Sequence, residues 1–159
     1  MEEYSIRSFR PADRDEILRI TIDSFVNVSI ERNVEDSFGP IDGKDWKWRK
    51  ARQVSAELDR DPDGAFVAEC DERIVGYITT LRDHEAGIGL IPNLAVDASR
   101  RGGGIGRALI ERALRHFRES GLAHARIETL QQNPVGQHLY PSCGFREVAR
   151  QIYFAIDLH

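Results

Sequence analysis

The feature that most constrains this chain is a run of glycines, Arg101-Gly102-Gly103-Gly104-Ile105-Gly106, set between an apolar segment and an amphipathic one. Residues 88–96 before the run are apolar and predict a strand, and apolar residues recur every four positions from Ile105 to Phe117, which predicts a helix. Glycine lacks a Cβ and tolerates positive φ, so backbone amides there can approach an anion closely. The first amides of a helix have no partner within it and lie at the positive end of its dipole. The junction therefore favours a phosphate group.

Two other glycine motifs fit this loop poorly. A P-loop needs Gly-Lys followed by Ser or Thr, whereas Gly106 is followed by Arg107. The dinucleotide fingerprint needs a third glycine three residues after the second, and Leu109 stands there instead. A turn that only caps the helix, with no ligand, stays an alternative. Arg100, Arg101 and Arg107 add positive charge to the loop.

The rest of the chain predicts an ordered series of strands and helices. Strands are predicted at 4–9, 65–68, 74–81, 88–96, 125–130, 145–149 and 151–158, and helices at 13–25, 45–58, 105–120 and 133–144. Asp13 and Glu16 fit a capping box, Pro92 predicts a bulge or a break in pairing, and residues 26–43 carry no clear pattern. This order predicts an α/β (α+β) fold, with one mixed, mainly antiparallel sheet of about six to seven strands and about four helices.

Composition narrows the class of protein. With 159 residues, 41% hydrophobic and 30% charged, the chain is expected to form a single soluble domain over 1–159. A net charge of −4 argues against a nucleic-acid partner. No signal peptide or membrane span is recognised, so we expect no membrane partner and a cytoplasmic location. The two cysteines, Cys70 and Cys143, and the five histidines lack metal-ligand spacing, so no metal is expected and both cysteines are predicted to be buried.

Three linked motifs resemble those of the GNAT superfamily of N-acetyltransferases. The family's pyrophosphate loop, Arg/Gln-x-x-Gly-x-Gly/Ala, is matched by Arg101, Gly104 and Gly106. Residues 93–97, Asn-Leu-Ala-Val-Asp, resemble the strand before that loop, and residues 133–145, from Asn-Pro through Leu-Tyr to Gly-Phe, resemble the closing pattern. The motifs cover about residues 91–146, and the order of elements fits the family over the whole chain. The resemblance implies a GNAT-like fold and acetyl-CoA as co-substrate.

The resemblance also implies which residues bind CoA. Backbone groups of Leu94, Ala95 and Val96 would align the pantetheine arm and polarise the thioester carbonyl. The pyrophosphate would be bound by Arg101, Gly102, Gly103, Gly104, Ile105, Gly106 and Arg107. Asn133 would contact CoA while also capping the helix that Pro134 begins. A plain buried strand at 94–96 is compatible with the same residues.

Two side chains are candidates for catalysis on the same ground. Attack of an amine on a thioester needs a neutral amine, a stabilised oxyanion and a proton for the leaving thiolate. Glu128, five residues before Asn133, matches a glutamate of the ribosomal-protein alanine acetyltransferase branch and is the candidate base. Tyr140 is the candidate proton donor. The alternatives are an outward strand residue for Glu128, with His84 or water as the base, and an aromatic side chain of the core for Tyr140.

The predicted function is acetyl transfer from acetyl-CoA to a primary amine by direct attack in a ternary complex. The alternatives are another acyl-CoA or an oxygen acceptor, or a non-catalytic acyl-CoA sensor. The acceptor could be a small molecule or a peptide amine, and a homodimer is compatible with the family. Trp46 and Trp48 lie in the acceptor segment, where core packing of one or both is expected. Acidic residues in that segment suit a cationic amine or form a solvated face; they are Glu31, Glu35, Asp36, Asp42 and Asp45.

Overall fold

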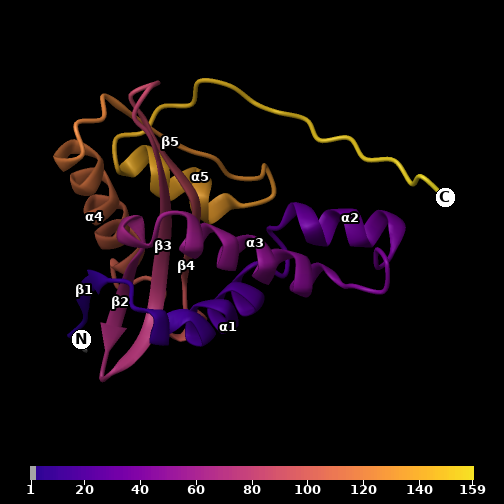
Figure 1. The fold of residues 1–159 in the computed structure, drawn as a ribbon, viewed down its shortest axis with the longest axis horizontal. Helices are drawn as coiled ribbons and strands as arrows, with labels where there is room; N and C mark the ends of the chain where they lie inside the picture. Colours follow the sequence, from indigo (N-terminus) through magenta and orange to yellow (C-terminus); the bar gives the residue numbers. More distant parts are fainter. Residues whose placement is uncertain (1–2) are drawn as a thin grey trace.

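A computed structural model describes residues 3–159 and arranges them as one five-stranded sheet covered by helices (Figure 1). The strands are β1 (Ser5–Ser8), β2 (Phe66–Cys70), β3 (Arg73–Asp83), β4 (Ile88–Val96) and β5 (His124–Ile127). The helices are α1 (Arg14–Ser24), α2 (Ile30–Phe38), α3 (Trp46–Arg60), α4 (Ile105–Glu119) and α5 (Pro134–Ser142). The predicted fold class is confirmed, although the described residues form five strands, fewer than expected, and five α-helices, one more than expected.

The sheet is mixed and mainly antiparallel, as predicted. Its order is β1-β2-β3-β4-β5, and every neighbouring pair is antiparallel except β4 and β5, which are parallel. A parallel pair needs a crossover, and α4 supplies it between β4 and β5. The crossover begins at the glycine run, so the fold fixes that loop at the end of β4.

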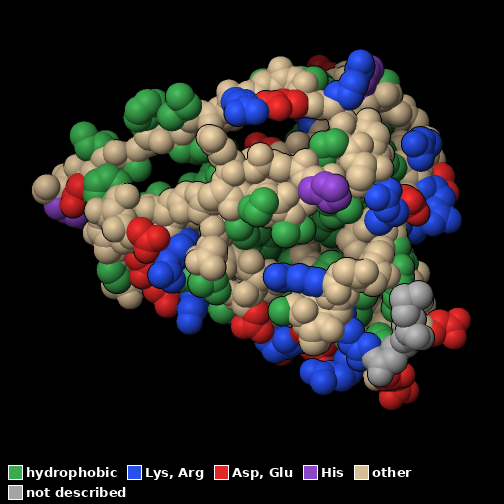
Figure 2. Space-filling view, turned by 180° about the vertical axis from the view of Figure 1, so that it is seen from behind, with side chains coloured by type: hydrophobic (Ala, Val, Ile, Leu, Met, Phe, Trp, Pro, Cys, Tyr) green, Lys and Arg blue, Asp and Glu red, His purple; other side chains and the backbone are tan. Residues whose placement is uncertain are grey.

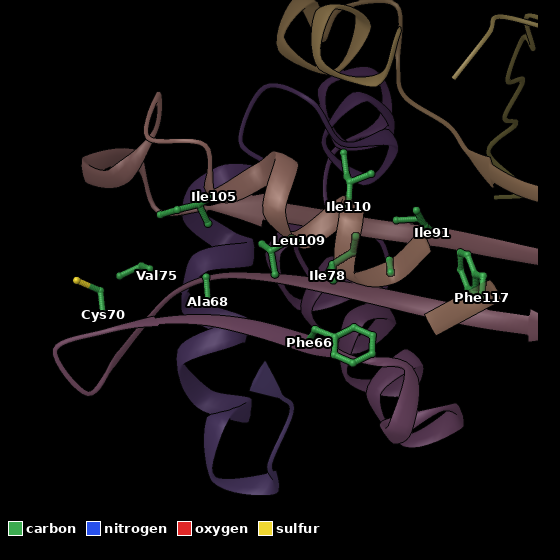
Figure 3. Close-up of a cluster of buried hydrophobic side chains, with 11 residues drawn as sticks. Phe66, Ala68, Cys70, Val75, Ile78, Ile91, Ile105, Leu109, Ile110 and Phe117 are labelled. Atoms are coloured by element: carbon green, nitrogen blue, oxygen red, sulfur yellow. The ribbon is translucent and has the colours of Figure 1, made fainter. Parts of the chain in front are cut away.

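Two buried clusters lie on opposite faces of the sheet. Side chains alternate between faces along a strand, and the register shift between β2 and β3 at Val75 interrupts that alternation in β3. Ile74 and Tyr77 therefore join one cluster, while Val75 and Ile78 join the other. The first cluster packs β3 against α1 and α3. The second cluster packs the sheet against the apolar stripe of α4 (Figure 3). Its buried members are Phe66, Ala68, Cys70, Val75, Ile78, Ile91, Ile105, Leu109, Ile110, Ala113 and Phe117.

Helix α2 was not predicted, although Ile30, Val34 and Phe38 recur along it every four residues, which is a helical spacing. None of its residues is buried. Ser29 precedes it but makes no side-chain capping bond. The helix contacts α3, and Glu31 accepts a hydrogen bond from Arg49 at 2.6 Å. Contacts with α3 rather than a buried face thus hold this helix.

The capping box predicted at Asp13 and Glu16 is wrong. A 3-10 turn at Pro11–Asp13 begins before the predicted start, and the Asp13 carboxylate accepts from the Arg10 amide at 2.7 Å. The same carboxylate forms two hydrogen bonds with Arg7, at 2.8 and 2.9 Å. Glu16 accepts from the backbone amide of Ile74 at 2.8 Å. The Asp13 carboxylate therefore closes the 3-10 turn and binds β1, while Glu16 joins α1 to β3, and neither caps α1 itself.

The two strands predicted at 145–149 and 151–158 are also wrong. Residues 145–159 are extended but carry no strand pairing, and beyond Phe145 every one of them is exposed. The C-terminal end runs out past α2, away from the sheet (Figure 1). The sequence has a strand pattern there, but a strand forms only where another strand supplies hydrogen-bond partners. In the described chain the segment finds none.

Candidate functional site

Strand β4 separates from β5 partway along its length. The two strands pair from Ile88 with His124 to Ile91 with Ile127, and β4 then continues to Val96 without β5 beside it. At the same point the register between β3 and β4 shifts, so that Ile91 and Pro92 of β4 face Thr80 alone. The interruption predicted at Pro92 is thus a bulge. One edge of residues 92–96 is left open toward the β5 side.

Leu94, Ala95 and Val96 all lie in this open section. On the other edge they pair with Ile78, Tyr77 and Gly76 of β3. The side chains of Leu94 and Val96 pack on the α4 face, and that of Ala95 packs on the face of α1 and α3. Backbone groups on the open edge are therefore available to a ligand while the side chains hold the strand in place.

A 3-10 turn (Ala98–Arg100) joins β4 to the glycine run, which then leads into α4. Gly102 and Gly104 have φ of 83° and 84°, a region that favours glycine. A Cβ built on Gly102 would meet no atom within 4 Å, and one on Gly103 would lie 3.7 Å from the nearest atom, Arg100 O. The loop surface is therefore open. This open, left-handed loop at a helix N-terminus fits a pyrophosphate group.

The amides at the start of α4 complete this cradle. The first hydrogen bond of the helix runs from Ala108 N to Gly104 O at 3.0 Å, which leaves the amides before it without a helical acceptor. The Ile105 side chain is buried, so that residue would offer only its amide. A Cβ on Gly106 would lie 3.2 Å from Leu139 Cδ2, which shows that Gly106 also allows α5 to approach α4.

Two of the arginines in this region make contacts within the chain. Arg101 Nε donates to Val96 O at 3.2 Å. Arg107 donates to Ser142 O at 3.0 Å and to Ser142 Oγ at 2.8 Å, at the end of α5. Both side chains are exposed and add positive charge near the loop. Arg107 in addition joins α4 to α5.

Asn133 caps α5, as predicted. Its side-chain oxygen accepts from Gly136 N at 3.3 Å, and its amide donates to Thr129 Oγ1 at 2.9 Å. A Cβ on the buried Gly136 would lie 2.9 Å from both of those side-chain groups and 3.1 Å from Tyr140 Cε2. The absence of a side chain at Gly136 therefore lets the Asn133 cap and the Tyr140 ring lie close to this residue.

Tyr140 is half-buried near the end of α5. Its ring meets that of Phe145 edge to face at 6.4 Å, and Tyr140 O accepts from Phe145 N at 3.1 Å. Burial, with a smaller contribution from Cys143, raises the pKa of Tyr140 to about 12. Within residues 3–159 the hydroxyl has no hydrogen-bond partner. It is therefore protonated at neutral pH and free to donate.

Glu128 follows β5 immediately, at the point where β4 and β5 part. Its side chain is exposed, and it makes no hydrogen bond with any described residue. His84 lies in the turn before β4, and Leu94 is six residues beyond Ile88, about 20 Å along the strand. Glu128 is thus at the open section and His84 is at the opposite end of β4. This arrangement disfavours His84 as the base.

A buried polar network behind β4 was missed in the sequence. Lys50 Nζ donates to Asn93 Oδ1 at 2.6 Å, and Asn93 Nδ2 donates to Glu57 Oε2 at 2.7 Å. Glu57 also accepts from Thr79 Oγ1 at 2.9 Å. Burial lowers the pKa of Lys50, against the raising effect of Glu57. The sequence does contain a signal for their burial: Lys50 lies four residues before Val54 and Glu57 three residues after it, so both share the buried face of α3 with Val54.

The acidic segment near α2 is largely satisfied within the chain. Glu31 and Asp36 pair with Arg49 and Arg32 at 2.6 and 3.1 Å. Asp45 accepts from Trp48 N at 2.9 Å, and Glu35 accepts from Trp46 N. Four of the five acidic side chains therefore have partners, and the segment gives little support to a cationic acceptor.

The two tryptophans and the two cysteines each divide between buried and more exposed positions. Trp46 is 3% exposed and belongs to the core, whereas Trp48 is 46% exposed. The Trp48 ring contacts the ammonium of Lys44 at 4.7 Å. Cys70 is buried as predicted, but Cys143 is only half-buried at the end of α5.

Comparison with known proteins identifies similar sequences and folds. The model of the acetyltransferase (GNAT) family matches residues 27–145. A mycothiol acetyltransferase of Thermomonospora curvata is 34% identical over 109 residues, which cover 69% of this chain and 36% of that protein. Another from Segniliparus rotundus is 30% identical over 157 residues, covering 94% of this chain and 54% of the relative. The chain thus spans about half the length of these relatives or less.

Solved structures share the fold. The PaiA N-acetyltransferase of Thermoplasma acidophilum, in complex with coenzyme A, has a TM-score of 0.72 at 19% identity, covering 91% of this chain and 90% of that chain. The ribosomal-protein-S18-alanine N-acetyltransferase of Escherichia coli has a TM-score of 0.66 at 19% identity, covering 92% of this chain and 80% of that chain.

No helix within residues 3–159 is long and apolar enough to cross a membrane. The same residues contain no cluster of three or more His, Cys, Asp or Glu suited to a metal ion.

Proposed function

Because the chain belongs to the acetyltransferase (GNAT) family, we propose that residues 1–159 form one acetyltransferase domain. The domain transfers an acetyl group from acetyl-CoA to a primary amine by direct attack in a ternary complex. The observation that carries the proposal is the open edge of β4, which is followed after one 3-10 turn by the left-handed glycine loop. One surface then offers backbone groups to an extended arm and helix amides to an anion.

The CoA contacts follow from that surface. The open edge at Leu94, Ala95 and Val96 would hold the pantetheine arm, with a backbone amide available to the thioester carbonyl. The amides from Gly102 to Arg107 would hold the pyrophosphate, because the loop is open and lies at the positive end of α4. Arg101 would add charge beside it. Asn133 would shape the adjoining wall as the cap of α5.

The reaction needs two proton movements. The amine nitrogen bonds to the acetyl carbon while the carbon–sulfur bond breaks, so the nitrogen loses a proton and the sulfur can take one. Glu128 would accept the proton, directly or through water, because it lies where β4 and β5 part. Tyr140 would donate to the leaving sulfur from the facing helix.

The raised pKa of Tyr140 refines its role. With a tyrosine pKa of about 12 and a thiol pKa of about 8.5, full proton transfer would be uphill by roughly 5 kcal/mol. A hydrogen bond that strengthens as negative charge develops on sulfur avoids that cost. Tyr140 would therefore act mainly as a hydrogen-bond donor, with the final proton supplied by solvent.

The acceptor is proposed at the level of its class. Relatives named mycothiol acetyltransferases support a small molecule rather than a peptide. The acidic segment adds no preference for a cation, because four of its five carboxylates already have partners.

An acceptor screen tests the proposal. The chain is incubated with acetyl-CoA and pools of thiol-containing amines, aminoglycosides, polyamines and peptide N-termini. Free CoA thiol is followed, and acetylated products are identified by mass spectrometry. Acceptor-dependent thiol release with a matching acetylated amine is expected. CoA binding by calorimetry without release by any pool would instead favour an acyl-CoA sensor.

A further inference from the structure

The proposed base and the proposed thioester-binding residues lie on two strands that have parted. The ladder between β4 and β5 ends at Ile91 and Ile127, so no strand pairing sets the spacing between Leu94 and Glu128. Glu128 itself makes no hydrogen bond with any described residue. Proton transfer between groups on the two strands still needs a spacing defined to within about 1 Å. Some other contact must therefore hold the segment that carries Glu128.

The connection between β5 and α5 ends in a turn that follows Glu128 closely. Asn133 N donates to Leu130 O at 2.9 Å, which makes Gln132 one of the two central residues of this turn. Only Glu128 and Thr129 separate the turn from β5, so the turn begins within about 10 Å of the end of the strand. Asn133 Nδ2 also donates to Thr129 Oγ1 at 2.9 Å. The position of the turn therefore limits the position of Glu128.

The side-chain amide of Gln132 binds the segment between α1 and α2. Its nitrogen donates to Asn27 O at 2.6 Å and to Asn33 Oδ1 at 3.0 Å, and its oxygen accepts from Asn33 Nδ2 at 2.9 Å. We call these three bonds the amide clasp. Both amide protons and the oxygen have partners, so the orientation of the Gln132 side chain is fixed. The connection from β5 to α5 reaches toward α2 in Figure 1.

The segment that receives the clasp is itself joined to the open section of β4. Asn27 lies two residues after Phe25, which ends α1, and the Phe25 ring lies 4.3 Å from the ammonium of Lys50. Lys50 donates to Asn93 Oδ1 at 2.6 Å, and Asn93 directly precedes the open edge. A path of contacts thus runs from β4 through α3 and the end of α1 to Gln132. It spans the gap that β4 and β5 leave.

Nothing else in the described chain supplies such a tie by hydrogen bonding. Within residues 3–159, no other hydrogen bond joins residues 128–132 to an element outside β5 and α5. The hydrogen bonds of residues 146–159 are local, from Arg150 to Glu147 and from His159 to Asp157. Figure 2 shows hydrophobic side chains of this C-terminal segment along an arm that stands away from the body of the molecule. The clasp is thus the tie that holds the turn.

We propose that Gln132 is a positioning residue, whose amide clasp holds Glu128 at the distance from β4 that proton removal from the acceptor amine requires. The proposal rests on the proposed role of Glu128 as the base. Without the clasp the turn moves freely, and the Glu128 carboxylate spends less time within reach of the acceptor nitrogen. The expected defect is that of a misplaced base, which appears in kcat and not in the binding of acetyl-CoA.

Hydrogen exchange of the chain alone tests the clasp without any acceptor. Gln132→Ala removes all three bonds, whereas Gln131→Ala alters the other central residue of the turn, whose side chain makes no hydrogen bond with a described residue. The hydrogen-bonded backbone amides of Asn33 and Asn133 should exchange about 10-fold faster in Gln132→Ala and at wild-type rates in Gln131→Ala. Equal rates in the wild type and Gln132→Ala would overturn the clasp.

Kinetics test the positioning, with acetyl-CoA and the amine that releases thiol fastest in the acceptor screen. Gln132→Ala should lower kcat by about 10- to 100-fold, most at low pH, while the KM for acetyl-CoA stays within about 2-fold. In a Glu128→Gln background the same change should cost less than about 2-fold, because no base is left to misplace. Gln131→Ala should leave kcat unchanged in both backgrounds. A loss of equal size with and without Glu128, or at every pH, would show that Gln132 is only structural.

Failure of the proposed function gives a different result. No thiol release by the wild type, or an unchanged rate in Glu128→Gln, would refute Glu128 as the base and with it the positioning role of Gln132. The exchange rates of Gln132→Ala would still show whether the clasp holds the turn. If Glu128→Gln slows the reaction but Gln132→Ala does not, the base stands and the positioning role is refuted alone.

Discussion

The ammonium group of Lys50 on α3 lies 2.6 Å from the side-chain oxygen of Asn93 on β4. The amide nitrogen of Asn93 in turn donates to Glu57 at 2.7 Å, so one amide joins a buried cation to a buried anion. The ring of Phe25 lies 4.3 Å from the same ammonium. Asn93 immediately precedes the proposed CoA-binding residues of β4. The network therefore fixes α3 against the section of β4 that leaves β5.

Lys50→Met should destabilise the fold by about 3–5 kcal/mol, since it leaves Glu57 buried without its compensating cation. Lys50 and Glu57 are only 7% and 9% exposed, so water can compensate little. The double variant Lys50→Met/Glu57→Met should recover much of the loss, because no unpaired charge remains. Urea unfolding of Lys50→Met, Glu57→Met and the double variant, compared with the wild type, completes a double-mutant cycle. Strictly additive losses would show that the two side chains do not interact.

Asp13→Asn should remove an acid-dependent part of the stability. Burial alone would raise the pKa of Asp13, but hydrogen bonds from Arg7 and the Arg10 amide outweigh it and hold the pKa below its usual value. Such a group stabilises the fold above its unfolded pKa, and this stabilisation is lost as the pH falls through the folded pKa. We expect Asp13→Asn to cost about 1.5–3 kcal/mol at neutral pH.

That difference between wild type and Asp13→Asn should be constant down to about pH 5 and shrink below about pH 4. Urea unfolding between pH 7 and pH 2 measures it. The exposed Asp15→Asn, in the first turn of α1, is the control and should change little. If the difference in unfolding free energy persisted unchanged at pH 2, the charge of Asp13 would not be what stabilises the fold.

Gly104→Asp should weaken CoA binding by at least about 10-fold, because it places a carboxylate beside the proposed pyrophosphate site. Gly121→Asp is a matched control at the other end of α4, where φ is +77° and no atom lies within 4 Å of a built Cβ. Both changes carry similar backbone strain, but only the first adds charge at the loop. Calorimetric titration with CoA measures the two affinities. Equal losses would assign the effect to strain.

Gly106 needs a separate prediction because it has two roles. A Cβ added at Gly106 would meet Leu139, so Gly106→Ala tests the approach of α5 to α4 without adding charge. Gly106→Asp should weaken CoA binding more than Gly106→Ala does, by about 10-fold. The same titration compares the two. If Ala and Asp weaken binding equally, the defect comes from displaced α5.

The strands and helices with strong periodicity were predictable from sequence. Residues 88–96 form β4 with the predicted limits, and the apolar stripe from Ile105 to Phe117 packs under the sheet. The proline in β4 correctly signalled a break, since a residue without an amide cannot complete the ladder. Local chemistry determined these features, so local sequence was enough.

Features that depend on distant partners were not predictable. The C-terminal segment has a strand pattern, but pairing requires a neighbour that the pattern cannot supply. Glu16 suited a capping box with Asp13, yet its carboxylate accepts a hydrogen bond from the amide of Ile74, 58 residues along the chain. Lys50 and Glu57 carried no prediction, and they are joined in the core by Asn93 on the separate strand β4. Each error comes from a long-range contact.

Glu128→Gln should slow acetyl transfer by about 10²- to 10⁴-fold where the acceptor amine is mostly protonated. Removing the base matters most at low pH, because there the enzyme must deprotonate the amine, and high pH should partly restore the rate. The pH profile of kcat/KM measures this. The exposed Glu111→Gln on α4 is the control. A loss of equal size at every pH would point to acceptor binding instead.

Tyr140→Phe should lower kcat by about 10²- to 10⁴-fold while leaving CoA affinity and stability nearly unchanged. The ring and its contact with Phe145 persist, and only the hydroxyl that would stabilise the leaving sulfur is lost. Because burial raises the pKa of Tyr140 to about 12, the wild-type rate should show no decline from this group below about pH 11.

Tyr77→Phe is the control, for which the opposite result is expected. The Tyr77 hydroxyl is buried and lies 2.6 Å from Thr21 Oγ1, so its loss should lower the free energy of unfolding and leave kcat unchanged. Single-turnover rates and urea unfolding separate the two variants. Wild-type turnover by Tyr140→Phe, with chemistry rate-limiting, would mean that Tyr140 only packs the core.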